Sequence, residues 1–430
     1  MRRGDNAADI QLNLIDKKDR SIQSHGIAKL MRGPIQAIAA RYNANVKIVE
    51  VPPGPPVLST LVAEIYGPDY NQQIRIAKEV KDLFKKTKDV VDVDWMVEDD
   101  QPEYHIEVDK EKAMRYGVAT AQVAATVNAA LSGLPSGNIY QPISYNQTPV
   151  KLQLSDADKA SLDDILDLKI TGMEGNEVPI RDVVKVTRGT RQKNIYRKNQ
   201  KEVVYILADM AGKLESPSYA IANISDSLKN IQVLNGYSLK EEYTHQPEME
   251  YNFSLKWDGE WQLTYEVFRD LGIAFVVVIL LIYILIVGWF QNFTVPIVML
   301  AAIPLSLIGI VLGHWALGAY FTATSMIGFI ALAGVMVRNS VLLIDFINIR
   351  LKEGIPLKQS IIEAGAVRTT PILLTAGAVA LGAVIILFDP IFQGLAISLM
   401  GGTITSTFLT LLVVPLLYYR IMRKKYPVKK

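Results

Sequence analysis

Cysteine is absent from the 430-residue chain, and histidine is scarce. Without cysteine the folded protein has no disulfides, no thiolate metal sites and no cysteine nucleophile. A phosphate-binding glycine loop and a nucleophile elbow are also missing. The histidines lie far apart in the sequence, so a structural role is favoured over metal ligation for each of them: His25, His105, His245 and His314. We therefore expect no enzyme, no cofactor, no metal site and no nucleic-acid partner.

Charge is scarce in the last third of the chain. Residues 268–419 hold long runs almost free of Lys, Arg, Asp and Glu, whereas residues 1 to about 265 are charged like a soluble protein. The apolar runs are each near the roughly 20 residues that cross a hydrocarbon core about 30 Å thick. We expect a membrane α-helical bundle within residues 266–420, with five transmembrane helices near residues 271–290, 295–317, 322–349, 371–388 and 392–419.

Basic residues give an expected orientation for these spans. The connection between the third and fourth spans and the tail at 421–430 are rich in Lys and Arg, whereas the turns around Gly318 and Asp389 have none. The positive-inside rule then predicts a cytoplasmic C-terminus and an outer location for residues 1–265. An inverted topology is the alternative, and the charge bias opposes it.

The N-terminus bears on how such an outer domain is exported. No apolar segment follows Arg2 and Arg3, so the sequence shows no signal peptide. A large outer domain with neither a signal nor a preceding span has no evident export route. We therefore expect the chain to be the C-terminal piece of a longer protein.

The aqueous part alternates between short strands and amphipathic helices. Two βαβ-like units are predicted, and they suggest an α+β fold of ferredoxin-like subdomains. The first unit has strands at 10–15 and 45–51 around a helix at 26–40, and the second has strands at 61–66 and 90–96 around a helix at 71–86. A stretch rich in Gly, Pro and Asn follows, with only short strand signals, and it is predicted to be an inserted lobe. The expected boundaries are subdomains at 1–132, the lobe at 133–190, and the returning subdomain with an interfacial segment at 191–265.

Two short segments border these predicted domains. One is a proline-rich break that either contacts a substrate or acts as a rigid polyproline linker. It consists of Pro52, Pro53, Gly54, Pro55 and Pro56. The other is the polar and aromatic run before the first span, where Trp257 and Trp261 are expected to anchor an interfacial helix at the lipid headgroups.

Arg338 is a formal charge in the middle of the third predicted span. A cation at the membrane centre costs about 2.5–3.5 kcal/mol on insertion scales, so it normally faces a polar pathway or an acidic partner. No acid lies at comparable depth in the other four spans. The sequence therefore predicts that Arg338 belongs to a proton or ion relay whose acidic half lies outside this chain. A structural cation that snorkels or binds backbone carbonyls is the alternative.

Asp345 and Thr375 extend this polar region. A spacing of seven residues puts Arg338 and Asp345 on nearly the same helix face, about 10.5 Å apart along the axis and too distant for a salt bridge. For Asp345 an interfacial or helix-packing role stays open beside a relay role. Thr375 lies about one turn into the fourth span, where its hydroxyl donates either to a buried carboxylate or to its own helix backbone.

Several segments resemble the C-terminal half of resistance-nodulation-division (RND) efflux permeases. They are residues 289–293, 334–346 and 366–375 in the membrane part, and residues 106–118 in the aqueous part. The resemblance covers nearly the whole chain from about Asp9. It implies an antiporter of the bacterial inner membrane that is driven by the proton-motive force. Organic drugs, dyes, detergents or lipids are the implied substrates.

The resemblance also implies roles for the parts of the chain. The outer subdomains would be periplasmic porter subdomains, the lobe would dock to other subunits, and the spans would carry protons. The basic residue of the family's relay is usually lysine and here matches Arg338, while Asn339 and Thr375 match polar positions near it. Arginine is effectively always charged, so the titrating group would be an acid in the missing N-terminal half.

The implied partners are that missing half, further copies in a homotrimer, a periplasmic adaptor, an outer-membrane channel and membrane lipid. A chain without the acids and without half of the porter cleft is not expected to pump by itself. The alternative is a non-transporting remnant, or a membrane-anchored periplasmic assembly or binding protein.

Overall fold

The chain forms two compact units in the computed structural model. One comprises Met1–Met96 with Tyr196–Lys430, and the other comprises Val97–Ile195. The structure describes residues 7–16, 19–50, 54–140, 146–159, 161–212, 215–233 and 239–423.

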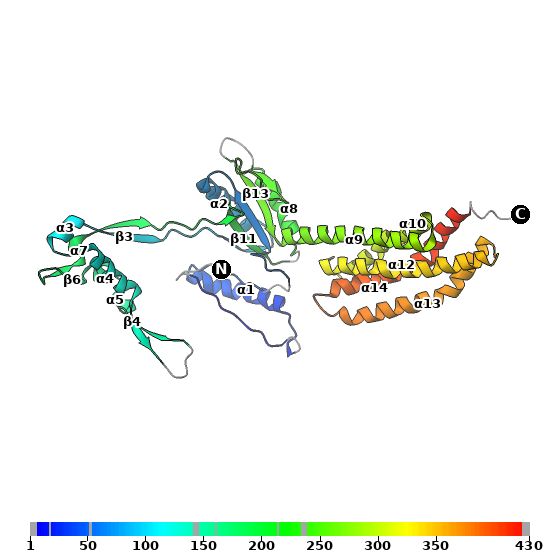
Figure 1. Ribbon diagram of the computed structural model, residues 1–430, viewed down its shortest axis with the longest axis horizontal. Helices are drawn as coiled ribbons and strands as arrows, with labels where there is room; N and C mark the ends of the chain where they lie inside the picture. The colour runs from blue at the N-terminus through cyan, green and yellow to red at the C-terminus, as the bar shows by residue number, and fades with distance from the viewer. Residues whose placement is uncertain are drawn as a thin grey trace. The chain divides into compact units, whose positions relative to one another are not determined.

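A sheet that includes β11 and β13 forms the aqueous part of the first unit (Figure 1). It has five strands in the order β12-β13-β1-β11-β2. Strands β12 and β13 are parallel, and the other neighbouring pairs are antiparallel. Strands β1 and β2 therefore run parallel with β11 between them, so that the β1-α2-β2 unit is split by one strand. The bounds are β1 Leu61–Tyr66, β2 Val90–Trp95, β11 Val204–Met210, β12 Lys240–Glu242 and β13 Ser254–Gly259, and a short hairpin comprises β9 Arg197–Lys198 and β10 Lys201–Glu202.

Helix α2 (Tyr70–Lys86) connects β1 to β2, and helix α8 (Pro217–Leu228) lies between β11 and β12 in the chain. Helix α2 begins after Asp69, whose carboxylate accepts a hydrogen bond from the Gln72 main-chain N–H at 2.8 Å. Its residues Ile76, Val80 and Phe84 recur every four positions and are fully buried. The predicted strands and helix at residues 61–96 are therefore present, with ends within one residue of those expected.

Trp257 lies in the core of this sheet and not at a membrane surface. Its side chain is 0 % exposed, and its ring stacks on Phe84 with centroids 6.0 Å apart. The indole N–H donates to Glu241 at 3.1 Å. The prediction that Trp257 anchors an interfacial helix is therefore wrong. The part of the polar and aromatic run that contains Trp257 is strand β13, whose alternation puts Trp257 on the face that packs against α2.

The first predicted βαβ unit is only partly present. Helix α1 (Ser24–Arg41) forms, but residues 10–15 and 45–50 are not strands in the structure. A strand needs a neighbour for its main-chain groups, and none of the described residues pairs with either segment. The segment at 45–50 instead lies beside β2, where Ile48 N–H donates to the Asp92 carboxylate at 3.2 Å and Arg32 of α1 forms an ion pair with it.

The second unit, Val97–Ile195, is wider than the lobe predicted at 133–190. The reason is that β3 pairs with β8 along its whole length, and α3 and α4 contribute to the same small apolar core. The hairpin of β4 and β5 is exposed at every described residue. The bounds are β3 Pro102–Val108, α3 Lys110–Arg115, α4 Thr120–Ser132, β4 Leu134–Ile139, β5 Thr148–Leu152, α5 Asp156–Lys159, α6 Leu162–Leu166, β6 Lys169–Thr171, β7 Glu177–Pro179, α7 Ile180–Val183 and β8 Val184–Thr190.

Within the described residues, five helices long and apolar enough to cross a membrane follow the sheet, as predicted. Helices α10 and α11 together form the second span. The helix of the fourth span, α13, begins 14 residues before the predicted start at residue 371, because Pro371 lies inside this helix and does not begin it. The bounds are α9 Glu260–Phe290, α10 Thr294–Leu300, α11 Ala302–Ala316, α12 Ala323–Lys352, α13 Leu357–Ile386 and α14 Gln393–Met422.

Helix α14 packs closely against α11 and α12 through small residues. A Cβ atom added to Gly309 would lie 2.4 Å from the carbonyl oxygen of Gly401, and one added to Gly402 would lie 2.2 Å from Leu332. The backbone contact leaves no room for a side chain at Gly309, and a side chain at Gly402 would displace Leu332, so glycine favours these close helix approaches. The glycine pair at 401 and 402 is therefore a packing feature.

Strand β13 passes directly into α9 through Gly259. This glycine has a φ of 78°, and an added Cβ would lie 2.6 Å from the Ser59 carbonyl oxygen and 3.0 Å from that of Thr60. The next residue, Glu260, donates its main-chain N–H to Thr60 O at 3.2 Å. The start of the first membrane helix is thus bonded to the residue that precedes β1.

Gly259→Ala should lower the free energy of unfolding by about 1–3 kcal/mol, because a left-handed backbone and two carbonyl contacts both oppose a Cβ. Thermal unfolding of the purified chain in detergent measures the effect. Gly272→Ala in α9 is the matched control, since nothing lies within 4 Å of its added Cβ. Equal melting temperatures for the two variants would contradict the predicted strain at Gly259.

Candidate functional site

Helix α12 presents two different faces at the centre of the third span. Arg338 is exposed, whereas its neighbours Asn339 and Ser340 are 3 % and 0 % exposed. Successive residues of a helix are turned by about 100°, so Asn339 and Ser340 face the other described helices while Arg338 does not. Arg338 forms no hydrogen bond or ion pair with any residue that the structure describes.

The exposed face of α12 continues from Arg338 along a stripe of small residues. Ala331 and Gly334 are exposed at helical spacing from it, and a Cβ added to Gly334 would meet no atom within 4 Å. Further along the helix, Leu342 is 44 % exposed. Small residues allow another helix to approach closely. This face is therefore suited to a helix that is not among those described.

Asp345 is half-buried two turns beyond Arg338 and has no hydrogen-bond partner among the described residues. Asn348, one turn further, accepts a hydrogen bond from the Tyr418 hydroxyl of α14 at 2.7 Å. Asn348 therefore contacts α14, whereas Arg338 of the same helix faces outward. The role of Asp345 stays a prediction.

Thr375 makes the local bond that the sequence left open. Its hydroxyl donates to the carbonyl oxygen of Ile372, one turn earlier in α13, at 2.9 Å. In the described part of the chain, no hydrogen bond or ion pair joins any two of Arg338, Asn339, Asp345 and Thr375. The structure therefore holds these four residues on the bundle without connecting them, and a relay among them needs further groups.

Sequence reasoning missed a buried layer of hydroxyl groups between α12 and α14. Thr407 and Ser406 donate to the carbonyl oxygen of Thr403 at 2.7 and 2.9 Å. Four further hydroxyls are buried without a hydrogen-bond partner among the described residues: Ser340, Ser398, Thr403 and Thr410. The signal was available, because Ser and Thr recur on α14 every three or four residues.

The proline-rich break lies partly within the described residues. Pro52 and Pro53 lie outside the described residues, while Gly54, Pro55 and Pro56 are exposed and have no regular secondary structure. Trp261 lies in the first turn of α9, and its indole N–H donates to Tyr243 O at 2.9 Å. Substrate contact for the break and a headgroup contact for Trp261 both stay predictions.

Known proteins share this combination of a mixed sheet domain and five apolar spans. Residues 1–422 match the sequence profile of the AcrB/AcrD/AcrF family. The chain belongs to this family. The resemblance to RND efflux permeases is thereby confirmed.

The relatives of this AcrB/AcrD/AcrF family member include proteins of several described roles. The chain is 28% identical over 372 residues to the swarming motility protein SwrC of Bacillus subtilis (strain 168), covering 84% of this chain and 33% of that protein. It is 27% identical to the nickel-cobalt-cadmium resistance protein NccA of Alcaligenes xylosoxydans xylosoxydans, covering 87% and 34%. The chain thus spans about a third of the length of these relatives.

The fold of the family member is also found in a solved structure. A crystal structure of a heavy metal efflux pump (crystal form II) superposes with a TM-score of 0.68 at 22% sequence identity, covering 94% of this chain and 41% of that one. This likeness supports the architecture of five apolar helices and a mixed sheet and helix domain. At this identity it concerns the fold alone.

Because the chain lacks cysteine, single cysteines can report which face of α12 is free. We expect Gly334→Cys to react with a maleimide in detergent at least about tenfold faster than Ala333→Cys, since a thiol at 333 reacts only through local opening of the bundle. Gly334 is exposed and Ala333 is 0 % exposed. Labelling followed by mass spectrometry gives both rates.

The native chain serves as the unreactive background for this experiment. Equal rates at the two positions would show that the Arg338 face is covered in the isolated chain, contrary to the structure.

Proposed function

We propose that the chain is the C-terminal part of an inner-membrane efflux transporter driven by the proton-motive force. The observation that carries the proposal is the exposed position of Arg338 in an apolar span, without a partner among the described residues. A permanent charge at this depth is costly, so it needs a polar partner. Family membership supports the transport class.

The relay is proposed to use Arg338 as a fixed charge. Arginine does not release its proton, so an acidic group that approaches the exposed face of α12 would take up and release protons beside it. The small residues Ala331 and Gly334 leave room for the helix that carries this acid. Asn339 and Thr375 are proposed as polar groups near the relay, and Asp345 as a group toward one end of it.

The substrate class is proposed to be organic and amphiphilic. Among the described residues no cluster of three His, Cys, Asp or Glu side chains is arranged to hold a metal ion. Cations are nevertheless the second candidate, because the names of several relatives describe resistance to nickel, cobalt, zinc or cadmium. Export of a dye and of Co²⁺ from the same vesicles distinguishes the two classes.

The proposed partners follow from the transporter class. They are an N-terminal half that supplies the acid, two further copies in a homotrimer, a periplasmic adaptor and an outer-membrane channel. In this arrangement residues 1–265 are periplasmic, the C-terminus is cytoplasmic, and the unit Val97–Ile195 docks to other subunits. A non-transporting assembly or binding protein is the alternative of another class.

Arg338→Ala in the complete transporter should reduce proton-driven efflux to background while expression stays normal, because the fixed charge of the relay is lost. Efflux from proteoliposomes under an imposed pH gradient is the measurement. The control is Arg350→Ala, which removes an arginine of the same helix that already pairs with Glu353 at 2.8 Å.

The control variant should retain most of its efflux, since Arg350 lies at the end of α12. Unchanged efflux in Arg338→Ala would remove Arg338 from the relay. Absence of efflux from the unmodified transporter would instead favour the non-transporting alternative.

A further inference from the structure

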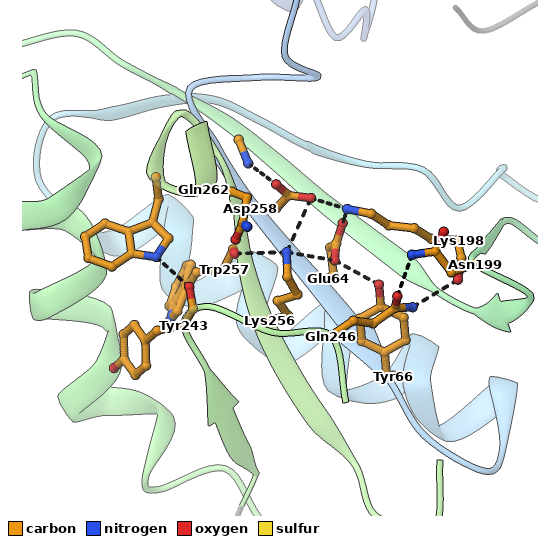
Figure 2. A network of polar contacts seen from close by, with 12 residues as sticks. Glu64, Tyr66, Lys198, Asn199, Tyr243, Gln246, Lys256, Trp257, Asp258 and Gln262 are labelled. Atoms are coloured by element: carbon orange, nitrogen blue, oxygen red, sulfur yellow. Dashed lines mark hydrogen bonds and ion pairs between the residues drawn. The ribbon is translucent and has the colours of Figure 1, made fainter. Parts of the chain in front are cut away.

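A cluster of charged side chains, two of them buried, lies on the sheet, far along the chain from Arg338. Figure 2 shows Glu64 of β1, Lys256 and Asp258 of β13 and Lys198 of β9 pointing toward one another. The Glu64 side chain is 0 % exposed and that of Lys256 is 5 % exposed. This face of the sheet is opposite to the face that carries Trp257, because side chains alternate along a strand.

The cluster pairs two carboxylates with two ammonium groups. Lys198 Nζ lies 2.5 Å from Glu64 Oε1 and also contacts the Asp258 carboxylate. Lys256 Nζ lies 3.7 Å from one oxygen of each carboxylate. Tyr66 donates its hydroxyl to Glu64 Oε2 at 2.8 Å, and Tyr205 of β11 is the cross-strand neighbour of Glu64. With both acids ionised, the four charges sum to zero.

Lys198 is the residue of the cluster that comes from outside the five-stranded sheet. It belongs to the β9–β10 hairpin, whose turn residues Asn199 and Gln200 both have positive φ, as a two-residue hairpin turn requires. The carbonyl oxygen of Lys198 accepts a hydrogen bond from Gln246 at 3.0 Å, and Asn199 donates to the Gln246 side chain at 2.8 Å. The hairpin is therefore joined to the sheet by Lys198, to residue 246 by these two bonds, and to the carbonyl oxygens of Pro247 and Glu248 by Lys201.

Glu64 is the member of the cluster that titrates near neutral pH. Burial and a hydrogen bond with Asp258 raise the pKa of Glu64 to about 7, and they outweigh the opposing charges of Lys256 and Lys198. Burial opposes ionisation of Asp258, but the hydrogen bonds from Glu64 and Lys198 lower its pKa to about 2. Burial, with the charge of Glu64, raises the pKa of Tyr205 to about 12.

Tyr66 and Lys198 keep their charge states across this range. Burial raises the pKa of Tyr66. Burial lowers the pKa of Lys198, but its bonds to Asp258 and Glu64 outweigh this effect and raise the pKa overall. A single proton therefore distinguishes the two states of the cluster near neutral pH.

We propose that Glu64, Asp258 and Lys198 form a proton-dependent clamp that fastens the β9–β10 hairpin to the sheet and closes when Glu64 is protonated. The proton adds to the Glu64 carboxylate, and the resulting O–H donates to Asp258, which keeps its ion pair with Lys198. The net charge of the cluster changes from zero to +1.

The direction of the effect follows from the burial of Glu64, on a face of the sheet where Tyr196 and Val203 beside the hairpin pack with Tyr66 and Tyr205. When the hairpin lifts, water reaches Glu64 and its pKa falls back toward the ordinary value of 4.5. The closed form therefore binds the proton more tightly than the open form. Closing is favoured at low pH, and this advantage is lost as the pH rises from about 4.5 through about 7.

The clamp has a consequence for the membrane helices. Two of its members, Lys256 and Asp258, belong to β13, which continues through Gly259 into α9. A proton taken up on the aqueous part therefore acts on the strand that leads into the first span. This sensor is separate from the charge at Arg338 and does not depend on transport.

Hydrogen exchange of the hairpin amides in the full chain tests the clamp. The Val203 main-chain N–H, which bonds to Tyr196 O at 3.0 Å, is a suitable reporter. After correction for intrinsic exchange, protection of residues 196–203 should be between about tenfold and about hundredfold greater at about pH 5 than at about pH 8, since each unit of pKa shift corresponds to a factor of ten. Mass spectrometry of the chain in detergent gives the protection.

Two variants separate the clamp from ordinary packing. Glu64→Gln imitates the protonated acid, because its amide donates to Asp258, and its hairpin should stay protected at both pH values. Glu202→Gln is the control, since Glu202 pairs with Arg197 in the same hairpin at 2.6 Å but lies outside the cluster, and it should keep the native pH dependence.

The native chain provides the decisive result even if a variant does not fold. A corrected protection that is flat between about pH 5 and about pH 8 would overturn the clamp. A pH dependence that survives in folded Glu64→Gln would assign the effect to another group and would also overturn it.

Discussion

Strand β13 is hydrogen-bonded on both sides, to β1 and to β12, and its last residue leads into the membrane helix α9. A shift of its register by one residue would turn every side chain to the opposite face. Trp257 would then leave the apolar core under α2, and Lys256 and Asp258 would leave Glu64. The core, the buried charges and the origin of α9 therefore depend on the same ladder of main-chain bonds.

Charged side chains have different surroundings in the aqueous part and in the membrane part. On the sheet, Glu64 and Lys256 are buried but find opposite charges within the same unit. In the third span, Arg338 faces away from the helices that pack around Asn339 and Ser340. The charges of the sheet are therefore paired with one another, whereas Arg338 has no opposite charge beside it among the described residues. This contrast is the physical basis for proposing a relay at α12 and a separate sensor on the sheet.

Helix packing in the bundle explains why one face of α12 is left free. Lipid tails are as apolar as leucine, so helices associate through close contact and not through exclusion of water. Gly309, Gly401 and Gly402 provide such contacts for α11, α12 and α14. Gly334 is as small but meets nothing among the described residues. It lies on the same face as Arg338. The face of α12 that allows another helix to approach closely is therefore also the face that carries the arginine charge.

Much of the architecture follows from local patterns in the sequence. The five spans are set by apolar length, and β1, α2 and β2 by periodicity. Two predictions failed for one reason, which is that they concerned partners distant in the chain. Residues 10–15 alternate like a strand but pair with no described strand. Trp257 has the sequence context of an interfacial anchor, but its strand lies between β1 and β12 in the sheet.

The sequence by itself determined the membrane spans, the relationship to RND permeases and the unusual charge of Arg338. These features depend on composition and on the order of residues that are close together in the sequence. Only the tertiary structure decided that Arg338 faces outward, that Thr375 bonds to Ile372, and that Glu64 meets Asp258 from 194 positions away. Burial and pairing of a charge depend on which distant strands become neighbours, and no local pattern contains that information.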